Sequence, residues 1–129
     1  MTRDGGLARH RPDALSDGTP IASLIDRERR EVAARVFSDP EIYPLELAPI
    51  FARNWIALGH ESEIPNTGDF VTRKMGDDPV ILTRRKDGGI DCLLNVCPHR
   101  AAVVCREEAG NCAVFRCIYH GWIFNPDGS

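Results

Sequence analysis

The segment that decides the fold class is 97-CPHRAAVVCREEAGNCAVFRCIYHGW-122, which contains two short motifs that each combine one cysteine with one histidine. The first motif is Cys97-Pro98-His99 and the second is Cys117-Ile118-Tyr119-His120, with 17 residues between His99 and Cys117. A β-like run precedes each motif, LLNV before the first and AVFR before the second. Two loops at the ends of neighbouring strands can present four ligands to one point.

Thiolates and imidazoles in equal number suit a cluster of two irons and two sulfides. Two neutral imidazoles on one iron raise the reduction potential of such a cluster to about −150 to +300 mV. A structural zinc site is the alternative, but zinc fingers usually place Cys with Cys and His with His, whereas each loop here is mixed. The pattern therefore predicts a Rieske-type [2Fe-2S] cluster and electron transfer. Its predicted ligands are Cys97, His99, Cys117 and His120.

Upstream of the motifs, short β-like runs alternate with turn signals. The runs are WIALGH at 55–60, DFVTRKM at 69–75, DPVILTRR at 78–85 and IDCLLNV at 90–96. Asp87-Gly88 between two apolar runs is the clearest hairpin signal. Short strands at this spacing predict an antiparallel β-sandwich or small barrel.

The chain before Trp55 has a helical character. Thr19-Pro20 predicts an N-cap followed by proline at the first helical position, and the helix should extend to about Ser38. Its apolar stripe would consist of Ile21, Ile25, Val32 and Val36. Residues 41–55 contain two prolines and predict two short turns or a kinked helix. We thus expect a mobile tail over 1–18, a helical lead-in over 19–55 and the β domain over 56–129.

Composition excludes several classes of protein. A chain of 129 residues is long enough for one modest core, and its net charge of −3 argues against a nucleic-acid partner. No apolar run approaches the about 20 residues of a membrane-spanning helix, and the first twenty residues lack the apolar region of a signal peptide. Five cysteines without a secretory signal indicate cytoplasmic thiols or metal ligands rather than disulfides. Cys92, which alternates with apolar neighbours in a predicted strand, is expected to be a buried free thiol.

These motifs resemble those in the N-terminal Rieske part of the alpha subunit of aromatic ring-hydroxylating dioxygenases. The family pattern is C-x-H-R-G followed by C-x-Y-H-G-W, and this chain has CPHRA at 97–101 and CIYHGW at 117–122. The similarity extends over about residues 39–129. Ala101 stands where the family usually has glycine, a residue that would suit a special backbone dihedral angle or a close approach to the cluster.

The resemblance implies a mainly β Rieske fold with N-terminal helices and two cluster-binding loops, incomplete at the C-terminus of this chain. Cys97 and Cys117 would bind one iron, and His99 and His120 the other. Electrons would arrive from a ferredoxin or reductase and leave through a histidine. Their destination would be a mononuclear Fe(II) in the oxygenase catalytic domain of a neighbouring subunit. That domain is missing from this chain, which alone would lack oxygenase activity.

The resemblance also implies a trimeric full-length protein, with a beta subunit as a further candidate partner. A stand-alone Rieske ferredoxin, an electron carrier rather than an enzyme component, is the alternative function that the motifs and length allow. The predicted helical lead-in favours the oxygenase, because ferredoxins tend to begin at the sheet.

Overall fold

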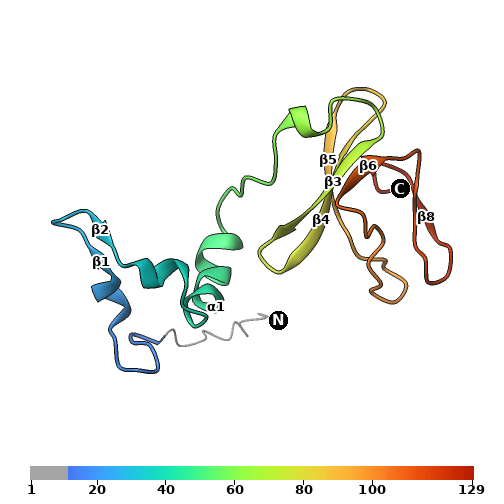
Figure 1. Ribbon diagram of the computed structural model, residues 1–129. Coiled ribbons are helices and arrows are strands. Elements are labelled where there is room, and N and C mark those ends of the chain that lie inside the picture. The colour runs from blue at the N-terminus through green and yellow to red at the C-terminus, as the bar shows by residue number, and fades with distance from the viewer. Residues whose placement is uncertain (1–11) are drawn as a thin grey trace, which may run out of the picture. The chain divides into compact units, whose positions relative to one another are not determined.

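The computed structural model describes residues 12–129 and divides the chain into two units, which meet between Arg53 and Asn54. Each unit is described separately, with its elements labelled in Figure 1. Among residues 12–129, no helix has the length and apolar character needed to cross a membrane.

The second unit is built on a four-stranded antiparallel sheet in the order β5-β4-β3-β6 (Figure 1). Its strands are β3 (Asp69–Met75), β4 (Asp78–Arg84), β5 (Ile90–Leu94) and β6 (Ala109–Asn111). Gly76 begins the two-residue loop between β3 and β4 with a φ of 62°, a position where such loops favour glycine. Gly88, with a φ of 84°, lies in the β4–β5 turn where the sequence predicts a hairpin.

A second, smaller sheet packs on the first. Strands β7 (Phe115–Arg116) and β8 (Ile123–Phe124) form an antiparallel hairpin. The ring of Phe115 lies 5.3 Å from that of Phe70 on β3, in an edge-to-face arrangement that suits two aromatic quadrupoles. The predicted mainly β, antiparallel fold is confirmed.

The core of this unit lies between the two sheets and the loops that follow β5 and β7. Its buried members are Phe70, Ile81, Cys97, Val104, Phe115 and Cys117. Two of the predicted metal ligands are therefore also core residues, and their sulfur atoms lie in an apolar environment.

Three of the four predicted β-runs contain strands, and one does not. Residues 55–60 form no strand, and a single 3₁₀ turn, Glu61–Glu63, follows them. Strand β6 was not predicted, because Ala-Gly-Asn has little β propensity and forms a strand only by pairing with β3. Cys92 is exposed rather than buried, since it lies on the opposite face of edge strand β5 from the core residue Leu93.

In the first unit, the single helix predicted from Thr19 to about Ser38 is wrong. A 3₁₀ turn (Ile21–Leu24), the short strands β1 (Ile25–Asp26) and β2 (Glu31–Val32), and a second 3₁₀ turn (Ala34–Phe37) occupy that stretch. The Asp26 carboxylate accepts hydrogen bonds from the backbone N–H groups of Glu28 and Arg29, at 3.0 and 2.9 Å. This local bonding stabilises a tight turn in competition with the helix.

The prediction of two short turns or a kinked helix around the prolines, rather than one smooth helix, is confirmed. Helix α1 (Ile42–Glu46) is followed at once by one π-helical turn (Leu47–Phe51). Pro44 is tolerated because it lies in the first turn of α1, where a backbone N–H would have no partner within the helix.

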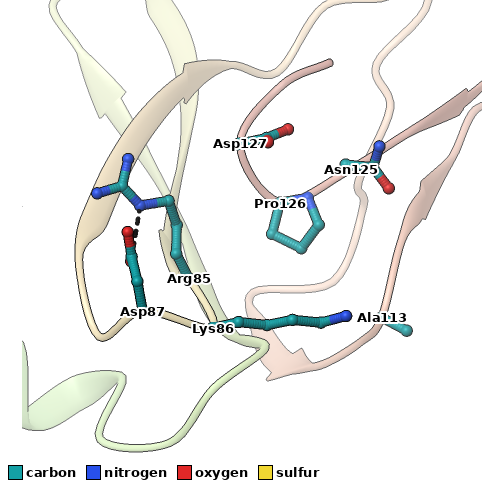
Figure 2. A pocket seen from close by; sticks show the side chains of 7 residues that line it. All are labelled: Arg85, Lys86, Asp87, Ala113, Asn125, Pro126 and Asp127. Atoms are coloured by element: carbon teal, nitrogen blue, oxygen red, sulfur yellow. Dashed lines mark hydrogen bonds and ion pairs between the residues drawn. The ribbon is translucent and has the colours of Figure 1, made fainter.

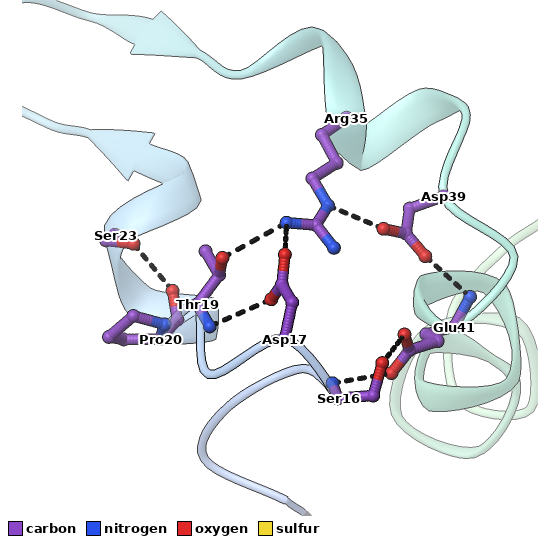
Figure 3. Close-up of polar contacts among 8 residues, drawn as sticks. All are labelled: Ser16, Asp17, Thr19, Pro20, Ser23, Arg35, Asp39 and Glu41. Atoms are coloured by element: carbon purple, nitrogen blue, oxygen red, sulfur yellow. Dashed lines mark hydrogen bonds and ion pairs between the residues drawn. The ribbon is translucent and has the colours of Figure 1, made fainter.

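A polar network around Arg35 holds the start of this unit together (Figure 3). Its guanidinium donates to the carboxylates of Asp17 and Asp39, at 2.6 and 2.5 Å, and to the Thr19 hydroxyl at 3.1 Å. The N-cap predicted at Thr19 is wrong. The residue before the first 3₁₀ turn is Pro20, and no side chain caps that turn. The backbone N–H of Thr19 and the Arg35 guanidinium together lower the pKa of Asp17 to about 2.

The predicted mobile tail lies partly outside the described residues, which begin at residue 12. Its described part, residues 12–18, packs on the unit through Leu15. This buried side chain forms a small apolar cluster with Leu24 and Ile42.

Candidate metal centre

The two motif loops share one backbone frame. In the first loop, the N–H of Cys97 donates to the carbonyl of Ala102 at 2.8 Å, and the N–H of Ala101 donates to the carbonyl of Cys97 at 2.8 Å. In the second loop, the N–H of Cys117 donates to Trp122 at 2.8 Å, and that of Gly121 donates back to Cys117 at 2.9 Å. Each cysteine is thus bonded to the fourth and fifth residues after it.

Antiparallel pairing on either side closes both loops. Val96 pairs with Val103 across the first loop, and Arg116 pairs with Ile123 across the second. The loops are therefore the tips of two hairpins, and the sequence between the paired residues has the same length in each. Only the histidine differs in position, two residues after the cysteine in the first loop and three in the second.

The fourth residue after each cysteine has left-handed backbone geometry, with a φ of 55° at Ala101 and 76° at Gly121. Left-handed geometry costs an L-residue with a Cβ about 1–2 kcal/mol, and glycine adopts it freely. The special dihedral angle expected from the family glycine is present, although an alanine occupies the position.

Both cysteines are buried, each with 2% of its surface exposed. The thiol of Cys97 lies within hydrogen-bonding reach of the Cys117 sulfur. The pKa of Cys117 lies below its ordinary value, chiefly because the backbone N–H of Tyr119 points at the sulfur. The Cys97 thiol and the N–H of His120 lower it further. A depressed pKa favours the thiolate, which is the form that binds a metal.

Both histidines are exposed, and their rings lie next to each other. The ring centroids of His99 and His120 are 4.6 Å apart, with an interplanar angle of 66°. An aromatic residue of the second loop covers each ring. Trp122 stacks on His99 at 5.1 Å and 1°, and Tyr119 lies against His120 at 3.9 Å and 36°.

The structure therefore brings together all four predicted ligands, as an inner cysteine pair and an outer histidine pair. Among residues 12–129, no three side chains of His, Cys, Asp or Glu are grouped around a point where they could hold a single ion. A zinc ion would need four donors at one centre. A binuclear cluster needs two protein donors on each of its irons, and the two pairs fit that requirement.

Asn95 supports the first loop and was missed by the sequence reading. This buried residue follows β5, and its side chain makes three hydrogen bonds to the chain just beyond the loop. It donates to the carbonyl of Cys105 at 2.7 Å and accepts from the N–H groups of Cys105 and Val104 at 2.8 and 3.2 Å. A polar residue inside the apolar run LLNV, next to a ligand motif, was the available signal.

A hollow of about 330 Å³ lies away from the four candidate ligands, between the β4–β5 turn and the C-terminal turn (Figure 2). Its charges carry both signs, and Arg85 is already paired with Asp87 at 3.1 Å and with Asp91 at 3.3 Å. Nothing in this lining converges on one bound group. Its lining residues are Arg85, Lys86, Asp87, Ala113, Asn125, Pro126 and Asp127.

Two hairpin loops that each offer a buried cysteine and an exposed histidine define an iron–sulfur domain with mixed ligands. Residues 54–129 match the Rieske [2Fe-2S] domain family, and the chain belongs to that family.

Proteins similar to this chain include alpha subunits of a dioxygenase and of an N-demethylase. It is 45% identical over 116 residues to the biphenyl dioxygenase subunit alpha of Metapseudomonas furukawaii, covering 88% of this chain and 25% of that subunit. It is 44% identical to the N,N-dimethyl phenylurea N-demethylase subunit alpha of a Sphingobium species, covering 88% and 26%. A naphthalene 1,2-dioxygenase structure with indole in its active site superposes with a TM-score of 0.69 at 46% identity, covering 81% and 24%. The chain thus spans about a quarter of the length of these relatives.

Proposed function

We propose that this chain is the electron-transfer part of an aromatic ring-hydroxylating oxygenase, with a [2Fe-2S] cluster held by its two hairpin loops. The observation that carries the proposal is the pairing of donors across the loops, cysteines inside and histidines outside. Cys97 and Cys117 would bind the inner iron, and His99 and His120 the outer one. When bound, such a cluster takes up and releases one electron at a time.

The residues around the donors have distinct roles in this proposal. Cys97 and Cys117 are buried in the apolar core, which would keep water away from an iron bound to their sulfur atoms. The N–H groups of Tyr119 and His120 favour a negative charge on the Cys117 sulfur and would help to tune the potential. His99 and His120 are exposed, so their rings would offer a path for electrons from the cluster to the surface.

The proposed partners follow from the relatives. These are alpha subunits about four times as long as this chain. A ferredoxin or reductase would supply electrons, and a mononuclear Fe(II) in the catalytic domain of a neighbouring subunit would receive them. A trimeric assembly, with or without a beta subunit, would bring the two centres together. A cytoplasmic location is part of the proposal, because none of the five cysteines forms a disulfide.

Cluster binding is tested by anaerobic purification followed by iron and sulfide analysis, absorption and electron paramagnetic resonance of the reduced protein. We expect about two irons and two sulfides per chain, with the signal of a mixed-ligand cluster. Cys97→Ser and Cys117→Ser should abolish that signal. The matched control Cys92→Ser, which removes an exposed thiol, should retain it. A colourless, signal-free protein that contains zinc would refute the proposal.

The oxygenase role is tested separately from cluster binding. The gene is read downstream of codon 129 for a continuing frame with a two-histidine, one-carboxylate pattern. Such a frame is expected. A frame that ends within a few codons of residue 129 would instead favour a stand-alone Rieske ferredoxin.

A further inference from the structure

The two candidate ligand loops have the same backbone hydrogen bonds but differ in the side chains that contact the opposite loop. The fifth residue after the cysteine is Ala102 in the first loop and Trp122 in the second. Only the second loop therefore has a large side chain at this position. That side chain reaches across to the first loop and stacks on His99 with an interplanar angle of 1°.

His120 has a different neighbour. Its ring lies 3.9 Å from Tyr119, the residue directly before it in the same loop. The second loop thus supplies the aromatic cover for both histidines. His99 is held from the opposite loop, whereas His120 is held from within its own.

Nothing covalent ties these loops together, because all five cysteines are free thiols. The backbone of Trp122 is fixed, since its carbonyl accepts the hydrogen bond from the N–H of Cys117 that closes the second loop. With 48% of its surface exposed, Trp122 contributes little to the hydrophobic core. Its indole ring stacks on the imidazole of His99.

From this geometry we infer that Trp122 is a positioning residue that fixes the ring orientation of His99 from the opposite loop. The inference rests on the proposed role of His99 as a cluster ligand. A flat stack at 5.1 Å restricts rotation of the imidazole about its side-chain bonds. If His99 binds the cluster, the direction in which its ring nitrogen faces the iron would depend on Trp122, which is not itself a proposed ligand. Tyr119 lies against His120 in a tilted contact and would have the corresponding effect on that ring.

The test uses the whole chain, purified anaerobically with its cluster and then reduced. Pulsed electron paramagnetic resonance resolves the couplings of the two histidine nitrogens. Trp122→Leu removes the ring and keeps an apolar side chain, whereas Trp122→Phe keeps a ring that can stack. Tyr119→Leu is the matched control on the other histidine.

We expect Trp122→Leu to change one nitrogen coupling, Tyr119→Leu to change the other, and Trp122→Phe to leave both close to the wild type. An aromatic pair contributes about 0.5–1.5 kcal/mol, so cluster loss under chelator should be about 2- to 13-fold faster in Trp122→Leu than in Trp122→Phe. If Trp122→Leu loses the cluster completely and Trp122→Phe keeps it, that result also supports the inference.

Unchanged couplings in Trp122→Leu would overturn the inference. So would equal changes of both couplings in Trp122→Leu and Tyr119→Leu, which would indicate general loosening of the loop. Equal loss of the cluster in the Phe and Leu variants would also overturn it. Absence of a mixed-ligand signal from the wild-type protein would instead refute the proposed ligand set, so the two failures are distinguishable.

Discussion

Ala101 and Gly121 occupy the same position in two equivalent loops, four residues after a buried cysteine, and both have a positive φ. The N–H of each donates to the carbonyl of its cysteine and so closes the turn that presents the histidine. The conformation is therefore required by the loop rather than by the residue. Gly121 adopts it without cost, and Ala101 adopts it against its own preference.

Replacement of Ala101 by glycine is expected to stabilise the protein. Relief of the left-handed strain is worth about 1–2 kcal/mol, and the added freedom of glycine in the unfolded chain offsets about 0.5–1 kcal/mol of it. The net gain should be up to about 1.5 kcal/mol in the free energy of unfolding, measured by denaturant titration. Ala102→Gly is the matched control and should be destabilising, because Ala102 packs against the core. Equal losses in the two variants would contradict the strain at Ala101.

Gly68 and Gly88 separate the cost of the dihedral angle from the cost of a clash. Their φ angles are 83° and 84°, but a Cβ on Gly68 would lie 2.8 Å from the carbonyl oxygen of Cys112, and one on Gly88 would meet nothing. Gly88→Ala should therefore cost up to about 1.5 kcal/mol, because the smaller freedom of alanine in the unfolded chain offsets part of the left-handed strain. Gly68→Ala should cost more, because a backbone group must move. Thermal unfolding of both variants measures the difference, and equal losses would rule out the clash.

Substitution of Asn95 should weaken the first loop selectively. Asn95→Ala removes three hydrogen bonds and leaves buried backbone groups without partners, at a cost of about 1–3 kcal/mol for each group that water cannot reach. Hydrogen exchange should become faster at Val104 and Cys105, whose N–H groups bond to Asn95. Asn125→Ala, at an exposed position, is the control. Unchanged exchange at those two amides in Asn95→Ala would contradict the supporting role.

The contribution of the Asp17 carboxylate to the stability of the first unit should be lost only at low pH. Its pKa of about 2 in the folded protein lies below the ordinary 3.8, so the carboxylate stabilises the fold above about pH 4. That stabilisation is lost progressively as the pH falls toward 2. Carbon-13 shifts of the carboxyl group should report the low pKa directly.

Arg35→Met provides a second measurement on the same group. The pKa of Asp17 should rise in this variant but stay below its ordinary value, because the hydrogen bond from the N–H of Thr19, its largest cause, remains. The pKa of Asp127, lowered chiefly by the N–H of Ser129 in the other unit, should not change. An Asp17 that titrates alike in both proteins would exclude the ion pair as a cause.

Patterns that reflect pairing between neighbouring strands were readable from the sequence. Strands β3, β4 and β5 alternate or run apolar, and glycine marks the turns between them. The helix predicted after Thr19 does not form. Its apolar residues have helical spacing, but the Asp26 carboxylate bonds to the backbone and stabilises a turn within the same stretch. Residues 55–60 have β-like composition, but a strand needs a partner, and composition does not supply one.

At the site, sequence spacing was sufficient to group the four donors but not to show how they are arranged. The two loops share the same pattern of backbone hydrogen bonds. Most residue types could form these bonds, so the residues of the motifs do not predict the pattern. The contact between His99 and Trp122 joins residues on different loops, and no local pattern predicts it. Asn95 likewise acts through backbone groups ten residues away.

The presence of Cys97 and Cys117 in the hydrophobic core has a thermodynamic consequence. If these two side chains hold iron, inorganic atoms complete the interior of the unit, and the unfolded chain has no comparable site. Ligand that binds only the folded state shifts the folding equilibrium by mass action. The population of folded protein would then depend on the supply of iron and sulfide. A shortage of either would first lower the amount of folded protein.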